Sequence, residues 1–285
     1  MNRRPFDYQS KMHEDHYNCS FIITKEALDS FALFCRVDLQ LSERTVKVHL
    51  CALNRYIKET GNSIDAKKIR IFLLKTKNNK TNPRTYRWLL CGIKRFCRDF
   101  LNKEEWTKTL KFPKIQPKLI THLPSRIDLN QFYEALPHTK AKALFLVYAS
   151  SGLRKSEILN AEIKPSIRAI IPTNHEQYST KNSYMSFYNS EAEDLLKQIN
   201  YDLKVSEVSI RRWFKKGYLQ TKIKITPQIL REWFCSQMAK LNVPDRYVDA
   251  YCGRLPRSIL AQRYTDYSIG TLKEIYDKAN MTVLK

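Results

Sequence analysis

The sequence has few of the residues that mark several protein classes. It contains only 6 glycines in 285 residues, which excludes collagen-like and glycine-rich linker sequences and argues against a glycine-rich nucleotide loop. No apolar run approaches the roughly 18 residues that a membrane-spanning helix needs. The polar, mixed-charge start over residues 1–17 is unlike a secretory signal peptide. We therefore expect a cytoplasmic protein with no membrane partner.

Signatures of disulfides and metal centres are also missing. The 7 cysteines are an odd number and form no CxxC pair, and none of the 6 histidines belongs to an HxxxH pair. A disulfide framework and a cysteine zinc site are therefore not expected. We expect the cysteines to be reduced and mostly buried, and we expect no metal ion.

Positive charge is what the sequence has in excess. There are 50 lysines and arginines against 28 acidic residues, a formal net charge of +22. Residues 1–112 carry 23 basic and 12 acidic residues and residues 113–285 carry 27 and 16, so each part has a net charge of +11. A basic excess over the whole chain suits a long polyanion such as nucleic acid. A lysine-rich, solvated surface is the alternative explanation.

Helical periodicity indicates a small all-α module over residues 19–112, after a frayed tail over residues 1–18. A polar loop, Lys75–Arg84, carries four basic residues and no acidic one, and no β pattern interrupts the module. For residues 75–87 two interpretations stay open: the segment contacts DNA, or it is a mobile loop. Helices are expected from Thr24, from Ser42 to Gly61, from Asp65 and from Thr85 to Leu101. The candidate DNA-binding residues are Lys75, Lys77, Lys80, Arg84, Arg87, Lys94 and Arg95.

Prolines 113, 117 and 124 predict an extended linker over residues 113–127, followed by a second domain over residues 128–285. Asp128 is expected to cap its first helix. The fold class expected for the whole chain is mainly α with a small β-hairpin, the hairpin lying in an α+β second domain. Its strands are predicted at residues 166–171 and 183–188, and its helices at residues 141–151, 152–160, 192–199, 205–215, 227–240 and 272–279.

Three basic residues stand where chemistry is plausible. Arg154 follows a glycine at the end of an apolar helix, Lys181 lies in the turn between the two strands, and Arg231 follows Thr226-Pro227 in an early helical turn. An unpaired buried guanidinium is costly, so arginines with apolar neighbours point toward a partner. Two of them can hold one phosphate through paired N–H donors. For each arginine taken alone, a structural salt bridge is the alternative.

Several segments together resemble the tyrosine recombinases, or phage-type integrases. Ser151-Gly-Leu-Arg-Lys-Ser-Glu-Ile-Leu159 resembles the first arginine box, Thr180-Lys181 the hairpin lysine, and Thr226-Pro-Gln-Ile-Leu-Arg231 the second box. Gly253-Arg254 and Arg263-Tyr-Thr-Asp-Tyr267 resemble the G-H box and the nucleophile segment. Residues 253–268 are most similar to archaeal, fuselloviral-type integrases. The resemblance covers roughly residues 128–285, and the first module matches a core-binding domain only in size and character.

This resemblance implies a site-specific DNA recombinase that clamps a duplex and acts as a tetramer on paired sites. Tyr264 would attack a phosphodiester and leave a 3′-phosphotyrosyl bond and a free 5′-hydroxyl. Arg154 and Arg231 would offset the charge on the phosphate, and Lys181 would protonate the leaving oxygen. The mechanism implied by the resemblance needs neither a metal nor another cofactor.

The sequence departs from the family pattern at two positions. Gln228 stands where the second box usually has histidine, and Arg254 stands where histidine or tryptophan is usual. Both side chains can bind phosphate, but neither is a good base, so we expect either slower chemistry or deprotonation of the phenol by water. Glu157 either orients Arg154 or is an ordinary surface glutamate. Tyr267 is a second candidate nucleophile, on nearly the same helical face as Tyr264, and Tyr276 is expected in the core.

Three other functions stay open: a DNA-binding relative without activity, a type IB topoisomerase-like relaxase and a basic RNA-binding protein. The last helix, Leu272–Ala279, docks either on a neighbouring protomer or on its own. The basic residues at 211, 212, 215 and 216 either contact phosphates or form a solvated helix face.

Overall fold

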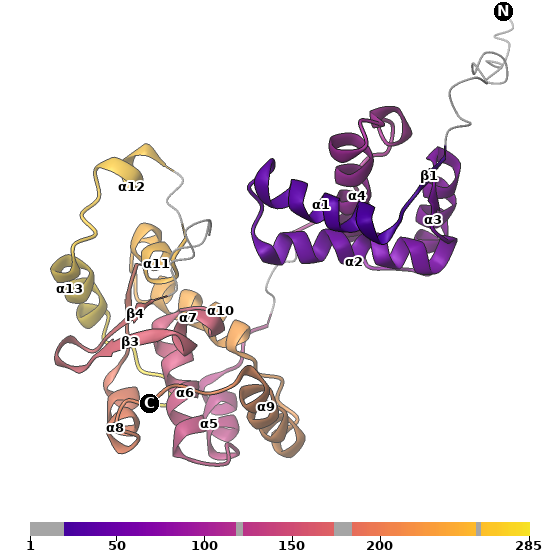
Figure 1. Ribbon diagram of the computed structural model, residues 1–285. Helices are drawn as coiled ribbons and strands as arrows, with labels where there is room; N and C mark the ends of the chain where they lie inside the picture. Colours follow the sequence, from indigo (N-terminus) through magenta and orange to yellow (C-terminus); the bar gives the residue numbers. More distant parts are fainter. Residues whose placement is uncertain (1–19, 118–121, 174–183, 255–257) are drawn as a thin grey trace, which may run out of the picture. The chain divides into compact units, whose positions relative to one another are not determined.

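The chain folds into two units, Met1–Lys118 and Leu119–Lys285. The computed structural model describes residues 20–117, 122–173, 184–254 and 258–285 (Figure 1). The border between the units falls inside the proline-containing segment 113–127, and each unit encloses its own apolar core. In the described part of the chain, no helix is long and apolar enough to cross a membrane.

In its described residues the first unit contains four α-helices, and three of them begin with a side-chain cap. Thr24, Asp65 and Asn82 each accept a backbone N–H in the first turn of the helix that they precede, which satisfies an otherwise unpaired donor. The elements are β1 (Phe21–Ile22), α1 (Lys25–Val37), α2 (Glu43–Thr60), β2 (Ser63–Ile64), α3 (Ala66–Asn78), α4 (Pro83–Lys94), the π-helix η2 (Arg95–Phe100) and the 3-10 helix η3 (Glu104–Trp106).

Aromatic rings fill the core of this unit. Phe31 and Phe96 meet edge to face with ring centroids 5.2 Å apart, and Tyr56 and Phe72 do so at 5.3 Å. All four rings are fully buried, and α2 packs along α4. The apolar positions that the periodicity selected are therefore those that hold the helices together.

Two features of the first unit differ from the sequence prediction. It is not wholly helical, because β1 and β2 pair as a two-stranded antiparallel sheet of two residues each. The predicted loop is also too long, because α3 continues to Asn78 and carries Lys75 and Lys77. Thr76 is buried and its hydroxyl donates to the Phe72 carbonyl at 2.9 Å, so the core-facing side of α3 continues into the polar run. The predicted tail lies outside the described residues.

Other helices of the second unit pack around one apolar helix, α6. Ala143 to Ser151 of α6 are all buried, and α8 and α10 pack against this helix, which lies in the middle of the unit (Figure 1). The helices are α5 (Arg126–Glu134), α6 (Thr139–Ser151), α7 (Lys155–Leu159), α8 (Ser190–Gln198), α9 (Glu207–Thr221), α10 (Pro227–Lys240), α11 (Asp245–Tyr251), α12 (Ile259–Arg263) and α13 (Ile269–Ala279), with a 3-10 turn η4 (Pro165–Ile167).

A three-stranded antiparallel sheet flanks these helices in the order β3 (Ala161–Lys164), β4 (Ala169–Pro172) and β5 (Ser186–Phe187). Ile170 pairs with Ile163 on one side and with Ser186 on the other. The strand predicted at residues 166–171 thus begins later, at Ala169. Pro165 and the left-handed Arg168, with φ 50°, make the preceding residues a turn. The sheet also contains β3, which the sequence analysis did not predict.

Other boundaries in the second unit also need correction. Its first helix begins at Arg126 with Ser125 as the cap, and Asp128 is the partner that accepts the Ser125 backbone N–H at 2.8 Å. The 7-residue α11 and the 5-residue α12 were not predicted, because so few turns leave no periodic pattern.

The C-terminal residues dock on their own unit. The Tyr276 hydroxyl donates to the Ser150 carbonyl at 2.8 Å, and Glu191 accepts the backbone N–H groups of Val283 and Leu284 at 2.6 and 3.1 Å. Met281 and Val283 are buried in the core. Of the two placements left open by the sequence, the structure has the intramolecular one.

Candidate active site

Arg231 lies at the centre of the candidate site and is only 5% exposed. It projects from the second turn of α10, which Thr226 caps, and its two terminal nitrogens donate to the carbonyls of Gly152 at 2.8 Å and Cys252 at 2.7 Å. These bonds join the end of α6 to the end of α11. A guanidinium has five N–H donors, so three remain for another acceptor.

Arg154 is held beside Arg231 by Glu157. The carboxylate accepts the Arg154 backbone N–H at 2.6 Å and its Nη1 at 2.5 Å, and its Oε2 lies 3.9 Å from Nη1 of Arg231. The side chain of Glu157 is 12% exposed. Of the two roles that the sequence left open, Glu157 therefore orients Arg154, and it also faces Arg231.

The local charge is positive in spite of this carboxylate. Burial lowers the pKa of Arg231, and the neighbouring charges of Arg154 and Arg254 lower it further. Arg254 donates to Asp249 at 2.9 Å and to the Cys235 sulfur at 3.6 Å. Three guanidinium groups thus repel one another around two carboxylates. An anion placed among them would relieve that repulsion.

A cavity of about 240 Å³ opens at these arginines. Among the described residues, Arg154, Arg231 and Gln228 line it together with Lys155, Thr226 and Pro227. Three of the predicted site residues are therefore brought together. Gln228 is exposed and donates to Glu232 at 3.0 Å, one helical turn away.

The remaining predicted site residues lie elsewhere. Arg254 is close to Arg231 but is not among the residues that line the cavity. Tyr264 caps the C-terminus of α12, is 75% exposed and is not part of the cavity wall either. Figure 1 shows α12 apart from α7 and α10. Lys181 falls outside the described residues.

The two alternative tyrosines are differently placed from Tyr264. Tyr267 does not share a helical face with Tyr264, because α12 ends at Arg263. The Tyr267 ring packs on Tyr247 with centroids 6.2 Å apart, and its hydroxyl is buried. Tyr276 is a core residue, as predicted, with 3% exposure. Tyr264 is the one of the three whose side chain is widely open to solvent.

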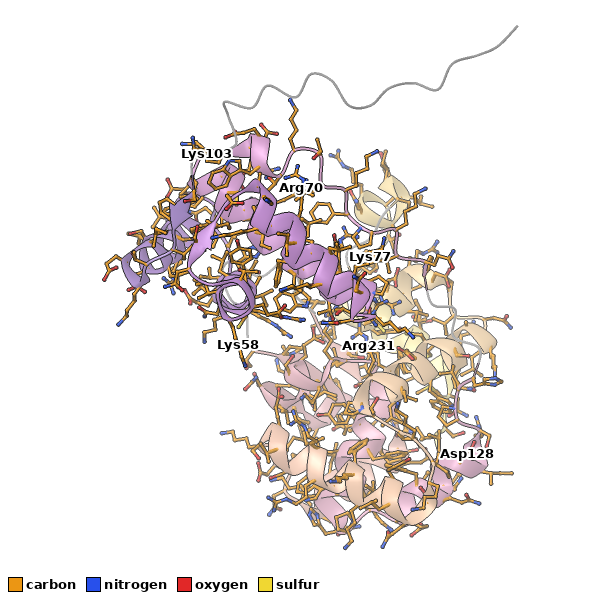
Figure 2. The ribbon with its side chains drawn as sticks, turned by 90° about the vertical axis from the view of Figure 1, so that its right-hand side faces the viewer. Lys58, Arg70, Lys77, Lys103, Asp128 and Arg231 are labelled. Atoms are coloured by element: carbon orange, nitrogen blue, oxygen red, sulfur yellow. The ribbon has the colours of Figure 1, made fainter. Side chains whose placement is uncertain are left out.

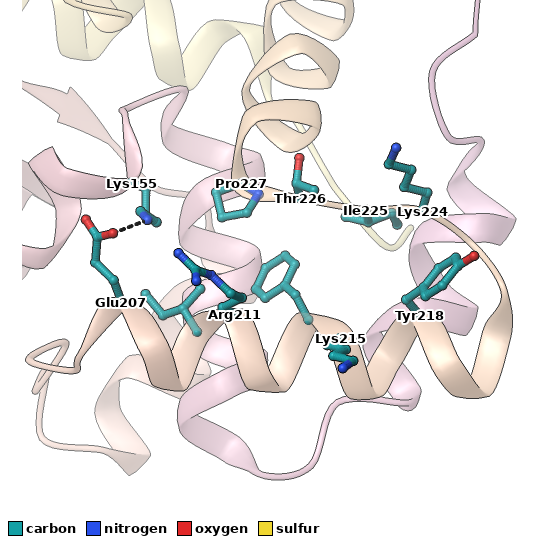
Figure 3. A pocket seen from close by; sticks show the side chains of 11 residues that line it. Lys155, Glu207, Arg211, Lys215, Tyr218, Lys224, Ile225, Thr226 and Pro227 are labelled. Carbon is teal, nitrogen blue, oxygen red and sulfur yellow. Dashed lines mark hydrogen bonds and ion pairs between the residues drawn. The ribbon is translucent and has the colours of Figure 1, made fainter. Parts of the chain in front are cut away.

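A larger groove of about 540 Å³ continues from the cavity along α9 (Figure 3). The two share Lys155, Thr226 and Pro227. At one end of the groove, Nζ of Lys155 donates a hydrogen bond to Oε2 of Glu207 at 2.5 Å. The buried residues Ile210, Phe214 and Ile225 give it an apolar floor, and its cations besides Lys155 are Arg211, Lys215 and Lys224.

The predicted DNA-binding residues of the first unit differ in their solvent exposure and in the groups that they contact. Lys75, Lys77, Lys80, Arg84 and Arg87 are exposed, whereas Arg95 forms an ion pair with Asp99 at 3.1 Å. Arg87 and Lys94 both lie over the ring of Phe112, at 5.6 and 5.3 Å from its centroid. Figure 2 shows Lys58, Arg70, Lys77 and Lys103 on separate parts of this unit, so its charge is not confined to one patch.

Sequence reasoning missed the groups that hold the arginines in place. These are the carbonyls of Gly152 and Cys252 and the side chains of Asp249 and Cys235. Backbone carbonyls leave no sequence signal, and an aspartate five residues before an arginine is too common to indicate a pair. In the described ranges, no group of three histidine, cysteine or acidic side chains could hold a metal ion.

Comparison with known proteins decides the family. Residues 121–281 match the family model described as archaeal phage integrase, which is more than half of the chain. The chain belongs to this family. It is therefore a tyrosine recombinase, and the arginine cavity of the integrase lies within the matched segment.

The integrase is similar to curated and solved proteins over most of its length. It is 24% identical over 281 residues to the tyrosine recombinase XerA of Pyrococcus furiosus, covering 91% of this chain and 96% of XerA. A lambda integrase dimer bound to a COC′ core site superposes with a TM-score of 0.64 at 12% identity, covering 87% of this chain and 78% of that one. The Tn1549 transposon integrase with circular intermediate DNA gives 0.55 at 14% identity, covering 87% and 97%. These solved structures share the fold.

Proposed function

We propose that this integrase cleaves and rejoins DNA at a specific site through a 3′-phosphotyrosyl bond to Tyr264. The observation that carries the proposal is the convergence of Arg154 and Arg231 on one cavity. Both guanidinium groups are fixed by protein acceptors and retain N–H donors. Two such groups match the oxygens of a single phosphate.

In the proposed reaction, the Tyr264 oxygen attacks the phosphorus atom of a DNA phosphodiester. The new P–O bond forms as the bond to the 5′-oxygen breaks, and Lys181 gives that oxygen a proton. Arg154 and Arg231 offset the charge that develops on the non-bridging oxygens. Attack by a 5′-hydroxyl on the phosphotyrosyl bond reverses these steps and rejoins the strand, so no nucleotide triphosphate is consumed.

Gln228 and Arg254 complete the phosphate site in this proposal. Gln228 lines the cavity and can donate through its amide, and Arg254 adds positive charge next to Arg231. Neither side chain takes up a proton near neutral pH. Water therefore accepts the phenol proton, and cleavage is slow compared with a site that contains histidine.

Tyr264 lies outside the cavity, so cleavage requires a change in its position. Either residues 258–267 move toward Arg231, or the tyrosine of another copy enters the cavity. A tetramer on paired DNA sites supplies such copies. The lambda integrase is known as a dimer on a core site and as a tetramer on a Holliday junction, which supports this assembly.

Double-stranded DNA is the proposed partner of both units. In the second unit, Arg211, Lys215 and Lys224 lie along the groove that continues from the cavity, where a DNA backbone would pass the site. In the first unit, residues 19–112 form the proposed core-binding domain, and Lys77, Lys80 and Arg84 contact phosphates.

Replacement of the nucleophile tests the proposal. Tyr264→Phe should abolish covalent protein–DNA adducts on nicked suicide duplexes, because phenylalanine has no oxygen to attack phosphorus. DNA affinity should stay within about twofold, because a lone exposed hydroxyl contributes little to a contact dominated by phosphates. Gel electrophoresis under denaturing conditions detects the adducts, and fluorescence anisotropy measures the affinity.

Tyr267→Phe is the matched control, and it should keep most adduct formation. Adducts that persist in Tyr264→Phe but not in Tyr267→Phe would move the nucleophile to Tyr267. No adducts from the parent chain would instead indicate a protein that only binds DNA. Relaxation of plasmids without site preference would indicate a topoisomerase-like enzyme.

A further inference from the structure

Two cysteines from different helices lie against each other behind the arginine cavity. The sulfur atoms of Cys235 in α10 and Cys252 at the end of α11 are 3.4 Å apart. Cys235 is one helical turn beyond Arg231, and Cys252 precedes Arg254 by two residues. Cys235 is partly exposed, whereas Cys252 is buried. An oxidant in solution can therefore reach the first sulfur before the second.

The backbone at Cys252 is part of the structure that holds the arginines. The Cys252 carbonyl accepts a hydrogen bond from Nη2 of Arg231 at 2.7 Å. The next carbonyl, that of Gly253, lies 3.4 Å from both terminal nitrogens of Arg154. A displacement of Cys252 therefore moves acceptors of both guanidinium groups.

The surroundings of the two sulfurs make them chemically unequal. The hydrogen bond with Cys252, together with the charges of Arg254 and Arg231, lowers the pKa of the Cys235 thiol although burial opposes this. The same hydrogen bond and burial raise the pKa of Cys252. The thiolate is the form that reacts with oxidants, so Cys235 reacts first and Cys252 keeps its proton.

We propose that a peroxide oxidises Cys235, that Cys235 and Cys252 then form a reversible disulfide, and that this bond slows DNA cleavage by displacing the carbonyls that hold Arg231 and Arg154. The inference rests on the proposed function of the same site. It adds a modification site and a means of regulation.

The chemistry of the step balances. The Cys235 thiolate attacks one oxygen of hydrogen peroxide, so a S–O bond forms, the O–O bond breaks and hydroxide leaves. The Cys252 sulfur then attacks the sulfenic sulfur of Cys235, and the S–O bond breaks as the S–S bond forms. The departing hydroxide takes the Cys252 proton and becomes water. The two cysteines lose two electrons, which the peroxide accepts, and a dithiol returns them.

The distance between the two sulfurs indicates that the disulfide slows DNA cleavage. A disulfide bond is about 2.05 Å long, so the two sulfurs must approach by roughly 1.4 Å. Misplacement of catalytic groups by about 1 Å can cost on the order of a hundredfold in rate. The oxidised protein should therefore cleave DNA at least about tenfold more slowly than the reduced protein.

Peptide mapping and adduct formation on the full chain test the proposal. The protein is treated with hydrogen peroxide, remaining thiols are alkylated, and proteolysis with mass spectrometry identifies linked peptides. We expect a Cys235–Cys252 link, slower adduct formation on nicked suicide duplexes, and recovery with dithiothreitol. In Cys235→Ala and in Cys252→Ala the adduct rate should not respond to peroxide. Cys51→Ala, which removes an exposed thiol in the other unit, should respond as the parent does.

The outcomes separate this inference from the proposed function. Absence of the linked peptide, an equal adduct rate in both redox states, or a peroxide response in Cys235→Ala would overturn it. A reduced parent that forms no adducts would contradict the proposed function. The inference then depends on the linked peptide and on weaker binding of inorganic phosphate by the oxidised protein.

Discussion

At the scale of single residues, the site depends on how charges are compensated. Arg231 is nearly buried, yet its acceptors are two neutral carbonyls, and Glu157 is the carboxylate within 4 Å of both arginines. A buried guanidinium without full compensation is costly for the folded chain. That cost is consistent with a site that is completed when a phosphate binds.

Glu157→Gln tests the positioning role of this carboxylate. The amide keeps the shape of the side chain but removes the charge that fixes Arg154, so adduct formation should slow by roughly ten- to a hundredfold. DNA affinity should change much less, because most phosphate contacts lie elsewhere. Single-turnover cleavage and anisotropy measure the two effects. Glu162→Gln, on the exposed edge of β3, is the control and should behave as the parent. An equal effect in both variants would argue against positioning.

Asp99 makes the folding stability of the first unit depend on pH. Burial favours a raised pKa at Asp99, but hydrogen bonds and charges from Arg98 and Arg95 outweigh it and lower the pKa below its usual range. The carboxylate therefore contributes stability above the ordinary pKa of aspartate, and this contribution is lost as the pH falls through the lowered value.

Asp99→Asn should reduce the free energy of unfolding by roughly 1 kcal/mol at pH 7, because the ion pairs are partly exposed. The difference from the parent should shrink as the pH falls below about 4, where Asp99 of the unfolded chain becomes protonated, and vanish once the pH is below the lowered pKa of the folded state. Urea denaturation across this range measures it. A difference that stays constant with pH would show that the packing of the residue matters and its charge does not.

At the scale of secondary-structure elements, the ends of helices build the site. Gly152 ends α6 in a left-handed conformation with φ 65°, and a Cβ there would lie 2.3 Å from Cδ1 of Phe234. Its carbonyl holds Arg231. The glycine of the first arginine box is therefore required by both backbone conformation and space.

Gly152→Ala should lower the free energy of unfolding by about 2–4 kcal/mol, because left-handed strain adds to overpacking against Phe234. Adduct formation should fall as well, since the carbonyl that holds Arg231 must shift. Gly270→Ala is the control: this helical glycine has open space around its Cβ position, and alanine should be neutral or slightly stabilising. Thermal and urea unfolding of both variants measure the difference, and equal stability would contradict the crowding at Phe234.

At the scale of the whole molecule, a net charge of +22 divided between two units governs how the chain meets a polyanion. Each phosphate contact releases condensed counterions, so DNA affinity should fall steeply as salt rises. The cations of the first unit are spread over its surface, and only those at the DNA contribute to this dependence.

Lys77→Gln should reduce the slope of log affinity against log salt by about 1 if this lysine contacts a phosphate. Lys58→Gln is matched to it, because both lysines are exposed in the last turn of a helix of the same unit (Figure 2). Lys58 was not among the predicted contacts, and its replacement should leave the slope unchanged. Anisotropy titrations at several salt concentrations provide the slopes. Equal slopes for the two variants would remove Lys77 from the interface.

The sequence by itself determined the long elements and the family. Apolar residues recur at helical spacing over α1, α2 and α10, and such periodicity survives without knowledge of the fold because it reflects one buried face. The order of Arg154, Arg231 and Tyr264 within recognisable segments also indicated a tyrosine recombinase, since each segment is contiguous in the chain and can be recognised without the fold.

Only the tertiary structure decided how these residues meet. Arg154, Arg231 and Gln228 share a cavity in which Glu157 holds Arg154 and carbonyls at the ends of α6 and α11 anchor Arg231, and carbonyls are common to every residue. The exposure of Tyr264 and the pairing of Cys235 with Cys252 likewise depend on contacts between distant segments. Local sequence patterns record which face of an element is buried, whereas long-range contacts depend on how the elements pack, which no local pattern encodes.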